Sequence, residues 1–325
     1  MQTEIGRTES DIRRAAELLS EGELVAFPTE TVYGLGGNAL DRDAARRIYA
    51  VKGRPSDNPL IVHLAEWSQA AEYAYVTEEG KALYDAFCPG PLTMIFKKRS
   101  CVPDETTGGR DTVALRFPSH PVARKLLTVS RLPIAAPSAN VSKHVSPTSA
   151  QHVYDDLDGR IPLILDGGDS EVGIESTIVD LTGDCPTVLR PGAITKEQIA
   201  AVLGDAKNYA GKVDEALAPG MKYKHYSPRV PCYLVKREEL GSAYRALEEK
   251  GLRVVLILRE DTGKTFEKAD VLSLGNTPEE AQRHIYAALR EAEKYDAALI
   301  EDLSDIYGCF AAMDRIKKAT GGSIL

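Results

Sequence analysis

The chain has 325 residues, of which 43% are hydrophobic and 27% are charged, as in globular proteins long enough to form two domains. Its formal net charge of −8 argues against a protein that functions mainly by binding a nucleic-acid backbone. The five cysteines are scattered and form no C-x-x-C pair, which disfavours a disulfide framework and a cysteine-based zinc site. No apolar run approaches the roughly 20 residues that span a bilayer, so we expect a soluble, cytoplasmic protein.

The first elements expected along the chain are a helix, a strand and a glycine-rich loop. Thr8 and Asp11 form a capping pair for a helix that Gly22 ends. A strand at 23–27 leads into FPTETVYGLGGNA (27–39), which matches neither the P-loop nor G-x-G-x-x-G. Its glycines therefore do not by themselves predict a phosphate site. A second helix follows in DRDAARRIYAVKG, and a short buried strand follows in LIVHL.

The middle of the chain is rich in short strands bounded by Gly, Pro, Asp or Ser. They are LTMIFKK, TVALRFP, LPIAAPS, PLILDGG, STIVDLT and TVLRPG. Two short helices interrupt them, near 120–129 and 147–156. Because strands outnumber crossover helices, we expect a mixed, partly antiparallel sheet with helices.

A stretch of weak periodicity at 206–230 separates this region from a second one. After it, CYLVK, RVVLILR, DVLSLG and AALIEDL alternate with helical segments, the last of them near 306–319. This alternation predicts a small parallel α/β unit. We therefore expect a catalytic domain at 1–207, a linker at 208–230 and a C-terminal domain at 231–325.

Four cations lie in loops or at strand positions beside small polar residues, namely Lys52, Arg54, Arg116 and Arg190. Prolines stiffen the KGRPSDNP loop, and cations on such a loop suit a polyanion such as a triphosphate. Arg116, within a strand, faces either a buried carboxylate or a substrate carboxylate. Taken singly, each cation is explained equally well as a surface charge, but their shared placement favours one anionic cleft. His63, beside apolar residues, is on its own more often a packed residue than a ligand contact.

Small hydroxyl and amide residues follow one of the predicted strands. APSANVSKHVSPT (136–148) holds Ser138, Asn140, Ser142 and Ser146. Such residues form local turns, and they also donate to phosphate or ribose, so both interpretations stay open. The chain has no nucleophile elbow, no Walker lysine motif and no evident Ser/His/Asp set. A reaction driven by positioning and charge stabilisation fits better than covalent catalysis.

Eight motifs occur in one order over roughly residues 10–205: PTETVYGLG, KGRPSDNPLIVH, PGPLT, ALRFPSHP, APSAN, SPT, GIESTIVD and LRPGAIT. This series resembles the YrdC-type threonylcarbamoyl-AMP synthase family, and KHYSP with the C-terminal α/β unit resembles its long, two-domain branch. The resemblance implies a YrdC-like twisted sheet joined to a smaller Rossmann-like domain. It implies condensation of L-threonine, bicarbonate and ATP, accompanied by Mg²⁺, to threonylcarbamoyl-AMP and pyrophosphate. The product would pass to a tRNA threonylcarbamoyl-transferase that modifies an adenosine next to the anticodon.

The resemblance also implies site residues. Those that would bind L-threonine are Thr31, His63, Arg116, Ala136 (through its backbone) and Ser176. Those that would face ATP are Lys52, Arg54, Asn58, Thr112, Ser138, Ser146, Arg190 and Tyr226, the last closing over the site from the linker. It gives no acid or base catalyst and no protein ligand for the metal.

Two rival functions are considered. One is a carbamoyl-transfer enzyme with a related domain, which would carry zinc-finger-like and acylphosphatase-like segments that this sequence lacks. The other is a module that binds tRNA or double-stranded RNA without catalysis. The net charge of −8 and the aromatic content of 6% disfavour such a module, and direct binding of tRNA stays open.

Overall fold

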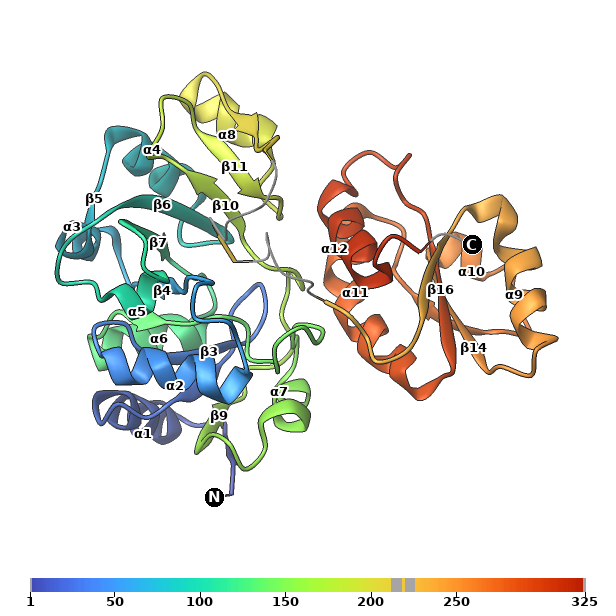
Figure 1. Cartoon of the computed structure of the whole chain (residues 1–325), viewed down its shortest axis with the longest axis horizontal. Coiled ribbons are helices and arrows are strands. Elements are labelled where there is room, and N and C mark those ends of the chain that lie inside the picture. Colours follow the sequence, from blue (N-terminus) through green and yellow to red (C-terminus); the bar gives the residue numbers. More distant parts are fainter. Residues whose placement is uncertain (1, 212–217, 220–225, 324–325) are drawn as a thin grey trace. The chain divides into compact units, whose positions relative to one another are not determined.

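The computed structural model describes residues 2–211, 218–219 and 226–323. The chain divides into two compact units (Figure 1). The first comprises 1–142, 147–171 and 175–223, and the second comprises 143–146, 172–174 and 224–325. Part of the linker predicted at 208–230, residues 212–217 and 220–225, lies outside the described residues. Within the described ranges, none of the helices combines the length and the apolar character that crossing a bilayer requires.

Side-chain caps fix the first two helices. Helix α1 (Glu9–Ser20) begins after Thr8, whose hydroxyl accepts the backbone N–H of Asp11, while the Asp11 carboxylate accepts the N–H of Thr8. This confirms the predicted capping pair. Helix α2 (Arg42–Lys52) begins after Asp41 and ends at Gly53, which has a left-handed backbone with φ of 61°. These caps place Lys52 in the last turn of α2.

A strand occupies the second half of the predicted glycine-rich loop, so the loop prediction is wrong there. Strand β3 (Gly34–Asn38) pairs antiparallel with β2 (Val25–Phe27) and with β8 (Ile134–Ala135). A Cβ atom on Gly36 would lie 2.8 Å from the side chains of both Ile134 and Phe27. The bare backbone thus lets neighbouring side chains pack directly on the strand.

Several short helices lie between the strands of the first unit. Two match predicted helices, α6 (Pro121–Ser130) and α7 (Ala150–Leu157). Others arise where no helix was predicted: the 3₁₀ turn η1 (Trp67–Gln69), α3 (Ala70–Tyr73), α4 (Glu78–Phe87), α5 (Asp104–Thr107) and α8 (Lys196–Leu203). The largest buried apolar cluster of the first unit, which includes Val62, Met94 and Leu115, is called the main core. Leu83 of α4 and Ile199 of α8 are buried in it, so tertiary packing accounts for these two helices.

The described strands of the first unit form one large mixed sheet. Its order is β1-β9-β2-β3-β8-β4-β7-β6-β10-β11-β12, and β5 pairs with β6 outside this path. The remaining bounds are β1 (Glu4–Gly6), β4 (Ile61–His63), β5 (Ala74–Tyr75), β6 (Leu92–Lys98), β7 (Thr112–Arg116), β9 (Leu163–Leu165), β10 (Thr177–Asp180), β11 (Thr187–Arg190) and β12 (Lys207–Asn208). Val62, Leu115 and Met94 project into the main core from one face of this sheet.

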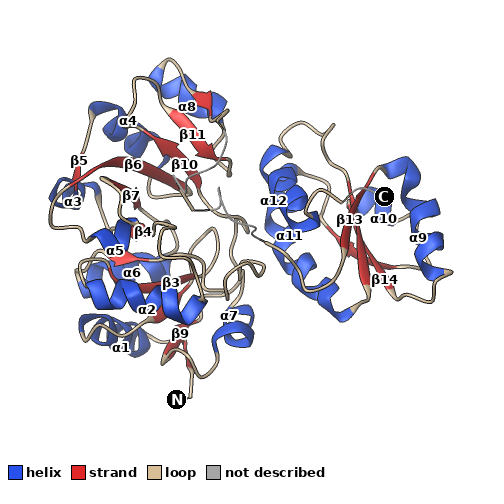
Figure 2. Cartoon of the chain, viewed as in Figure 1, coloured by secondary structure: helices blue, strands red, loops and turns tan. Residues whose placement is uncertain are grey.

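The second unit has a parallel sheet with helices on both sides (Figure 2). The strand order is β13-β16-β14-β15, with β13 (Cys232–Val235), β14 (Val254–Leu258), β15 (Asp270–Ser273) and β16 (Ala297–Glu301). The helical elements are η2 (Arg237–Glu239), α9 (Leu240–Glu248), α10 (Glu260–Gly263), α11 (Pro278–Glu291), η3 (Ala292–Lys294) and α12 (Phe310–Thr320). Together the mixed sheet and the separate parallel sheet confirm the predicted fold class.

Candidate active site

Neighbouring strands of the first sheet place polar residues in one row. The register pairs His63 of β4 with Arg116 of β7, and Arg116 with Thr93 of β6. It continues from Thr93 through the apolar Ile178 of β10 to Arg190 of β11. Residues directly opposite each other in a sheet project from the same face. The row, which we call the polar row, therefore unites predicted site residues from three separate motifs.

Arg116 lies at the centre of the polar row and is only 4% exposed. Its Nη2 atom donates to Glu30 Oε1 at 2.8 Å and to Thr29 Oγ1 at 3.4 Å. Its Nε atom is buried and finds no acceptor in the described parts of the chain. Leaving a buried guanidinium N–H without an acceptor is unfavourable, so an anionic ligand such as a carboxylate would complete this site.

Thr31 belongs to the same cluster. Its hydroxyl lies 2.9 Å from Thr29 Oγ1, and the Thr29 hydroxyl donates its own proton to the carbonyl of Val32 at 2.6 Å. Thr31 is therefore the donor to Thr29, and the oxygen of Thr31 keeps its lone pairs as acceptors. This arrangement suits a ligand that brings a donor group, such as an ammonium.

His63 is a neutral, buried side chain. Its Nδ1 lies 3.1 Å from the carbonyl oxygen of Ile61. Because a carbonyl can only accept, Nδ1 carries the proton of the neutral ring and Nε2 is an acceptor. Burial, and after it the neighbouring charge of Arg116, lowers the pKa of His63 to about 3. His63 can therefore orient a ligand by hydrogen bonding but does not supply positive charge near neutral pH.

Ser176 lies between Thr93 and Arg190, two residues of the polar row. Its hydroxyl lies 2.7 Å from that of Thr93. Arg190 donates from Nη2 to Ser176 Oγ at 3.1 Å and from Nε to the Ser176 carbonyl at 3.0 Å. Two residues predicted for different ligands, Ser176 for threonine and Arg190 for ATP, are thus direct neighbours.

An apolar strip runs beside the polar row, two residues away on each strand. Ile61, Ala114 and Ile95 are in register there and share the face of the polar row. They belong to a buried cluster with Ile178, Leu189 and Ala218. A small cavity at the strip is lined by Pro59, Leu60, Ile95, Thr107, Arg110, Thr112, Ala114, Ala218 and Pro219. The strip is an apolar surface with Thr112 at its edge, the kind of surface on which a flat ring packs, but Ala218 and Pro219 also line the cavity, which is too small for a nucleobase in this structure.

The loop after α2 is organised by its own cations. Lys52 is 2% exposed, and its Nζ donates to the carbonyls of Ser138 and Asn140. Arg54 donates from Nε to the carbonyl of Asn58 at 3.2 Å. The Oδ1 atom of Asn58 is buried and meets no donor within the residues the structure describes. These contacts bring together Lys52 and Ser138, two residues predicted to face ATP.

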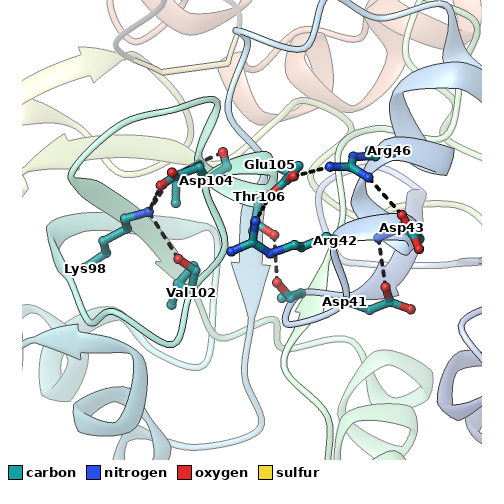
Figure 3. A network of polar contacts seen from close by, with 11 residues as sticks. Asp41, Arg42, Asp43, Arg46, Lys98, Val102, Asp104, Glu105 and Thr106 are labelled. Carbon is teal, nitrogen blue, oxygen red and sulfur yellow. Dashed lines mark hydrogen bonds and ion pairs between the residues drawn. The ribbon is translucent and has the colours of Figure 1, made fainter.

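An exposed network of ion pairs joins α2 to α5 (Figure 3). Arg46 of α2 contacts Glu105 of α5 at 2.6 Å and Asp43 at 3.1 Å. The hydroxyl of Thr106 donates to the carbonyl of Ala39 at 2.7 Å. The network holds α5 beside the helix that carries Lys52, and α5 leads into the Arg110–Thr112 segment at the cavity.

The other predicted residues have different surroundings. The backbone N–H of Ala136 donates to the carbonyl of Ile61 at 2.9 Å, which ties β8 to the apolar strip. Ser146 and Tyr226 belong to the second unit, where the Tyr226 ring lies 5.3 Å from that of Tyr286. Their contacts with a nucleotide stay predictions.

Three residues of this region were not singled out from the sequence, namely Glu30, Thr93 and Arg110. Glu30 and Thr93 lie inside the motifs PTETVYGLG and PGPLT; Glu30 is the charged residue of its motif, and Thr93 is a polar residue within an apolar run. These features could have identified both. Arg110 follows two glycines in an ordinary polar turn, and no feature of its own sequence distinguishes it.

Comparison with known proteins identifies the family to which the chain belongs. Residues 17–192 match the model of the Sua5/YciO/YrdC family, which is described as telomere recombination. The chain belongs to this family. Residues 194–321 match a second model, the C-terminal domain of threonylcarbamoyl-AMP synthase, so family similarity extends over both halves of the chain.

Relatives within the family are similar over nearly their whole length. The threonylcarbamoyl-AMP synthase of Pyrococcus abyssi is 44% identical, with 97% of this chain and 95% of that protein covered. The threonylcarbamoyl-AMP synthase of Bacillus subtilis is 43% identical, with 99% and 96% covered. The crystal structure of P. abyssi Sua5 complexed with L-threonine superposes with a TM-score of 0.93, at 43% identity and with 100% of this chain and 98% of that chain covered.

Proposed function

We propose that this chain condenses L-threonine, bicarbonate and ATP to threonylcarbamoyl-AMP and pyrophosphate. The observation that carries the proposal is the polar row beside the apolar strip, together with the unsatisfied Nε of Arg116 within the polar row. Such a surface offers a charged amino-acid subsite next to a subsite for a flat ring. The full-length similarity to proteins named threonylcarbamoyl-AMP synthase supports the same assignment.

The polar row is the proposed threonine subsite. Arg116 Nε would donate to the α-carboxylate, and the Thr31 oxygen and His63 Nε2 would accept from the donor groups of the amino acid. Ser176, fixed by Arg190, would close the subsite on the β11 side. The complex of P. abyssi Sua5 with L-threonine supports this choice of ligand.

The apolar strip and the loop after α2 form the proposed nucleotide subsite. The ring would lie on Ala114 and Ile95, with Thr112 at its edge. Asn58 has an unsatisfied amide oxygen that a ligand donor would pair with. Lys52, through Ser138, and Arg54 fix the loop that borders this space.

The reaction needs positioning more than it needs a nucleophilic side chain. The threonine amine attacks the carbon of bicarbonate, water leaves, and an oxygen of the resulting carbamate attacks the α-phosphorus of ATP as pyrophosphate departs. Carbamates lose carbon dioxide in water, so burial of the site protects the intermediate. Holding the two substrates side by side on adjacent rows of one sheet face supplies the proximity that this sequence of steps requires.

Magnesium is proposed to enter with ATP. Among the described residues, no group of three or more His, Cys, Asp or Glu side chains could hold a metal ion. Mg²⁺ is often held by substrate phosphates and water with few protein ligands, and its chemistry would be to offset phosphate charge. We further propose that the product passes to a tRNA threonylcarbamoyl-transferase.

Pyrophosphate release tests this function. The purified chain is incubated with ATP and Mg²⁺, and L-threonine and bicarbonate are omitted in turn. Release that requires both supports the proposal. Release that needs neither would indicate another ATP-using reaction, and no release together with salt-sensitive tRNA binding would favour an RNA-binding module.

A further inference from the structure

A buried carboxylate beside Arg116 has no role in the function proposed so far. Glu30 follows β2, and its side chain is 4% exposed. Its Oε1 accepts from Arg116 Nη2 at 2.8 Å, and its Oε2 accepts from the backbone N–H of Ser119 at 3.1 Å. Both oxygens are therefore engaged, and they link the loop after β2 to the turn after β7.

The pair is better explained by orientation than by stability. Removing two charges from water costs about as much as their attraction returns, so a buried ion pair is weak support for a fold. A guanidinium, however, is planar, and fixing one of its nitrogens fixes the directions of the others. With Nη2 directed at Glu30, the N–H of Nε points in one defined direction, where it meets no acceptor among the described residues.

We propose that Glu30 is a positioning residue, which holds Arg116 so that its Nε donates to the α-carboxylate of the amino-acid substrate. The proposal rests on the function proposed above and specifies how the site selects an α-amino acid. Glu30 also neutralises the charge of Arg116. The binding of a ligand carboxylate therefore depends more on the direction of the Nε–H bond than on net positive charge. Lysine at position 116 could not replace arginine, because its single nitrogen would be taken by Glu30.

The test measures selectivity for the carboxylate. Binding of L-threonine, L-threonine amide and ATP is measured by calorimetry on the full chain for wild type, Glu30→Gln and Glu30→Ala. We expect wild type to prefer threonine over its amide, and Glu30→Ala to reduce that preference at least tenfold while ATP affinity changes less than twofold. Glu30→Gln, which keeps an oxygen for Arg116 but turns an NH₂ group toward the Ser119 N–H, should fall between them. Glu4→Gln, at an exposed pair with Arg14, is the matched control and should leave all three affinities unchanged.

Several results would overturn the proposal. One is an unchanged preference in both Glu30 variants. Another is an equal loss of threonine and its amide, which would mean that Glu30 contacts the ammonium or acts on the fold alone. ATP binding reports whether each variant is folded, and if Glu30→Ala does not fold, Glu30→Gln decides. If the wild-type chain binds neither threonine nor ATP, the proposed function fails, whereas normal wild-type binding with unaltered variants refutes only this inference.

Discussion

In the first unit, β4, β7 and β6 bury Val62, Leu115 and Met94 on one face and carry the polar row and the apolar strip on the other. In the second unit, every residue of β14 and β16 is buried, and helices cover both faces of the sheet. Burial does not distinguish the two sheets, because β4 and nearly all of β7 are buried as well. The first sheet differs in that one of its faces carries polar side chains suited to a ligand, whereas β14 carries apolar side chains on both faces. The comparison shows where a substitution should alter binding and where it should alter stability.

Of the substitutions considered, Arg116→Ala should have the largest effect, and the effect should be on threonine binding. The change removes the proposed donor to the substrate carboxylate, and truncating one partner of a buried charge pair at a binding interface typically costs 2–5 kcal/mol of affinity. It also leaves Glu30 buried without its cation, which destabilises the fold. We expect threonine affinity to fall by about three orders of magnitude, with a much smaller loss for ATP, as measured by calorimetry. Equal losses for both ligands would contradict the assigned role.

Leu256→Ala should alter stability and leave binding intact. Leu256 is fully buried in β14, and a Leu→Ala change in a core costs about 3 kcal/mol. Hydrogen exchange should accelerate in peptides from 254–258 and 297–301 and remain slow in 92–98. Threonine affinity should stay within twofold of wild type. A loss of threonine affinity comparable to that of Arg116→Ala would contradict the prediction that the second sheet contributes to stability and not to binding.

Protonation of His63, a residue of the polar row, should make the free energy of unfolding depend on pH. Its pKa is lowered from 6.5 to about 3 in the fold, because the folded state disfavours the protonated ring. The contribution of His63 to stability is therefore fully present above pH 6.5. That contribution is lost as the pH falls from 6.5 toward 3, by about 2 kcal/mol between pH 6.5 and 5. Unfolding followed by the fluorescence of Trp67, the single tryptophan, should show a steeper loss in wild type than in His63→Gln. Parallel pH profiles would contradict this prediction.

Ala114→Leu tests the apolar strip. The larger side chain would fill the floor of the cavity, and we expect about a tenfold loss of ATP affinity, which corresponds to about 1.4 kcal/mol. Threonine affinity should change less than twofold, because the polar row begins two residues away. The measurement is again calorimetry with each ligand alone, and unchanged ATP affinity would place the nucleotide elsewhere.

Arg46→Ala should have the smallest effect. The Arg46 side chain is 62% exposed, and exposed ion pairs contribute about 0.2–1 kcal/mol each. Denaturant unfolding at low salt should show a loss of about 0.5 kcal/mol, which should vanish in 1 M salt because of screening. A loss above 2 kcal/mol would mean that the network in Figure 3 holds α5 far more strongly than exposed charges do.

Much of the fold follows from local signals in the sequence. Thr8 and Asp11 specify the start of α1, and continuous apolar runs such as RVVLILR specify the parallel strands of the second unit. The helices α4 and α8 were not predicted, because Leu83 and Ile199 acquire their partners only in the folded core. The glycines of β3 predict a loop by composition, because only the fold shows that they make room for the side chains of Phe27 and Ile134 on neighbouring strands.

The sequence predicts residues for the candidate site but not the contacts among them. The resemblance to a family supplied His63, Arg116 and Ser176, and the structure shows that the polar row and its contacts join them. The sequence could not show that Arg116 is paired with Glu30, because 86 residues separate them along the chain. The same holds for Arg190 and Ser176, which meet only through the pairing of β11 with β10.

The position of Arg116 also bears on how the sheet finds its correct strand alignment. Arg116 and Leu115 project from opposite faces of β7, so a shift of one residue against β4 would exchange them. The guanidinium would then enter the main core beside Val62 and Met94, and the leucine would face the ligand side. Burying an unpaired charge is far more costly than the lost backbone pairing of a short strand. The residue proposed to recognise the substrate thus also penalises misaligned sheets during folding.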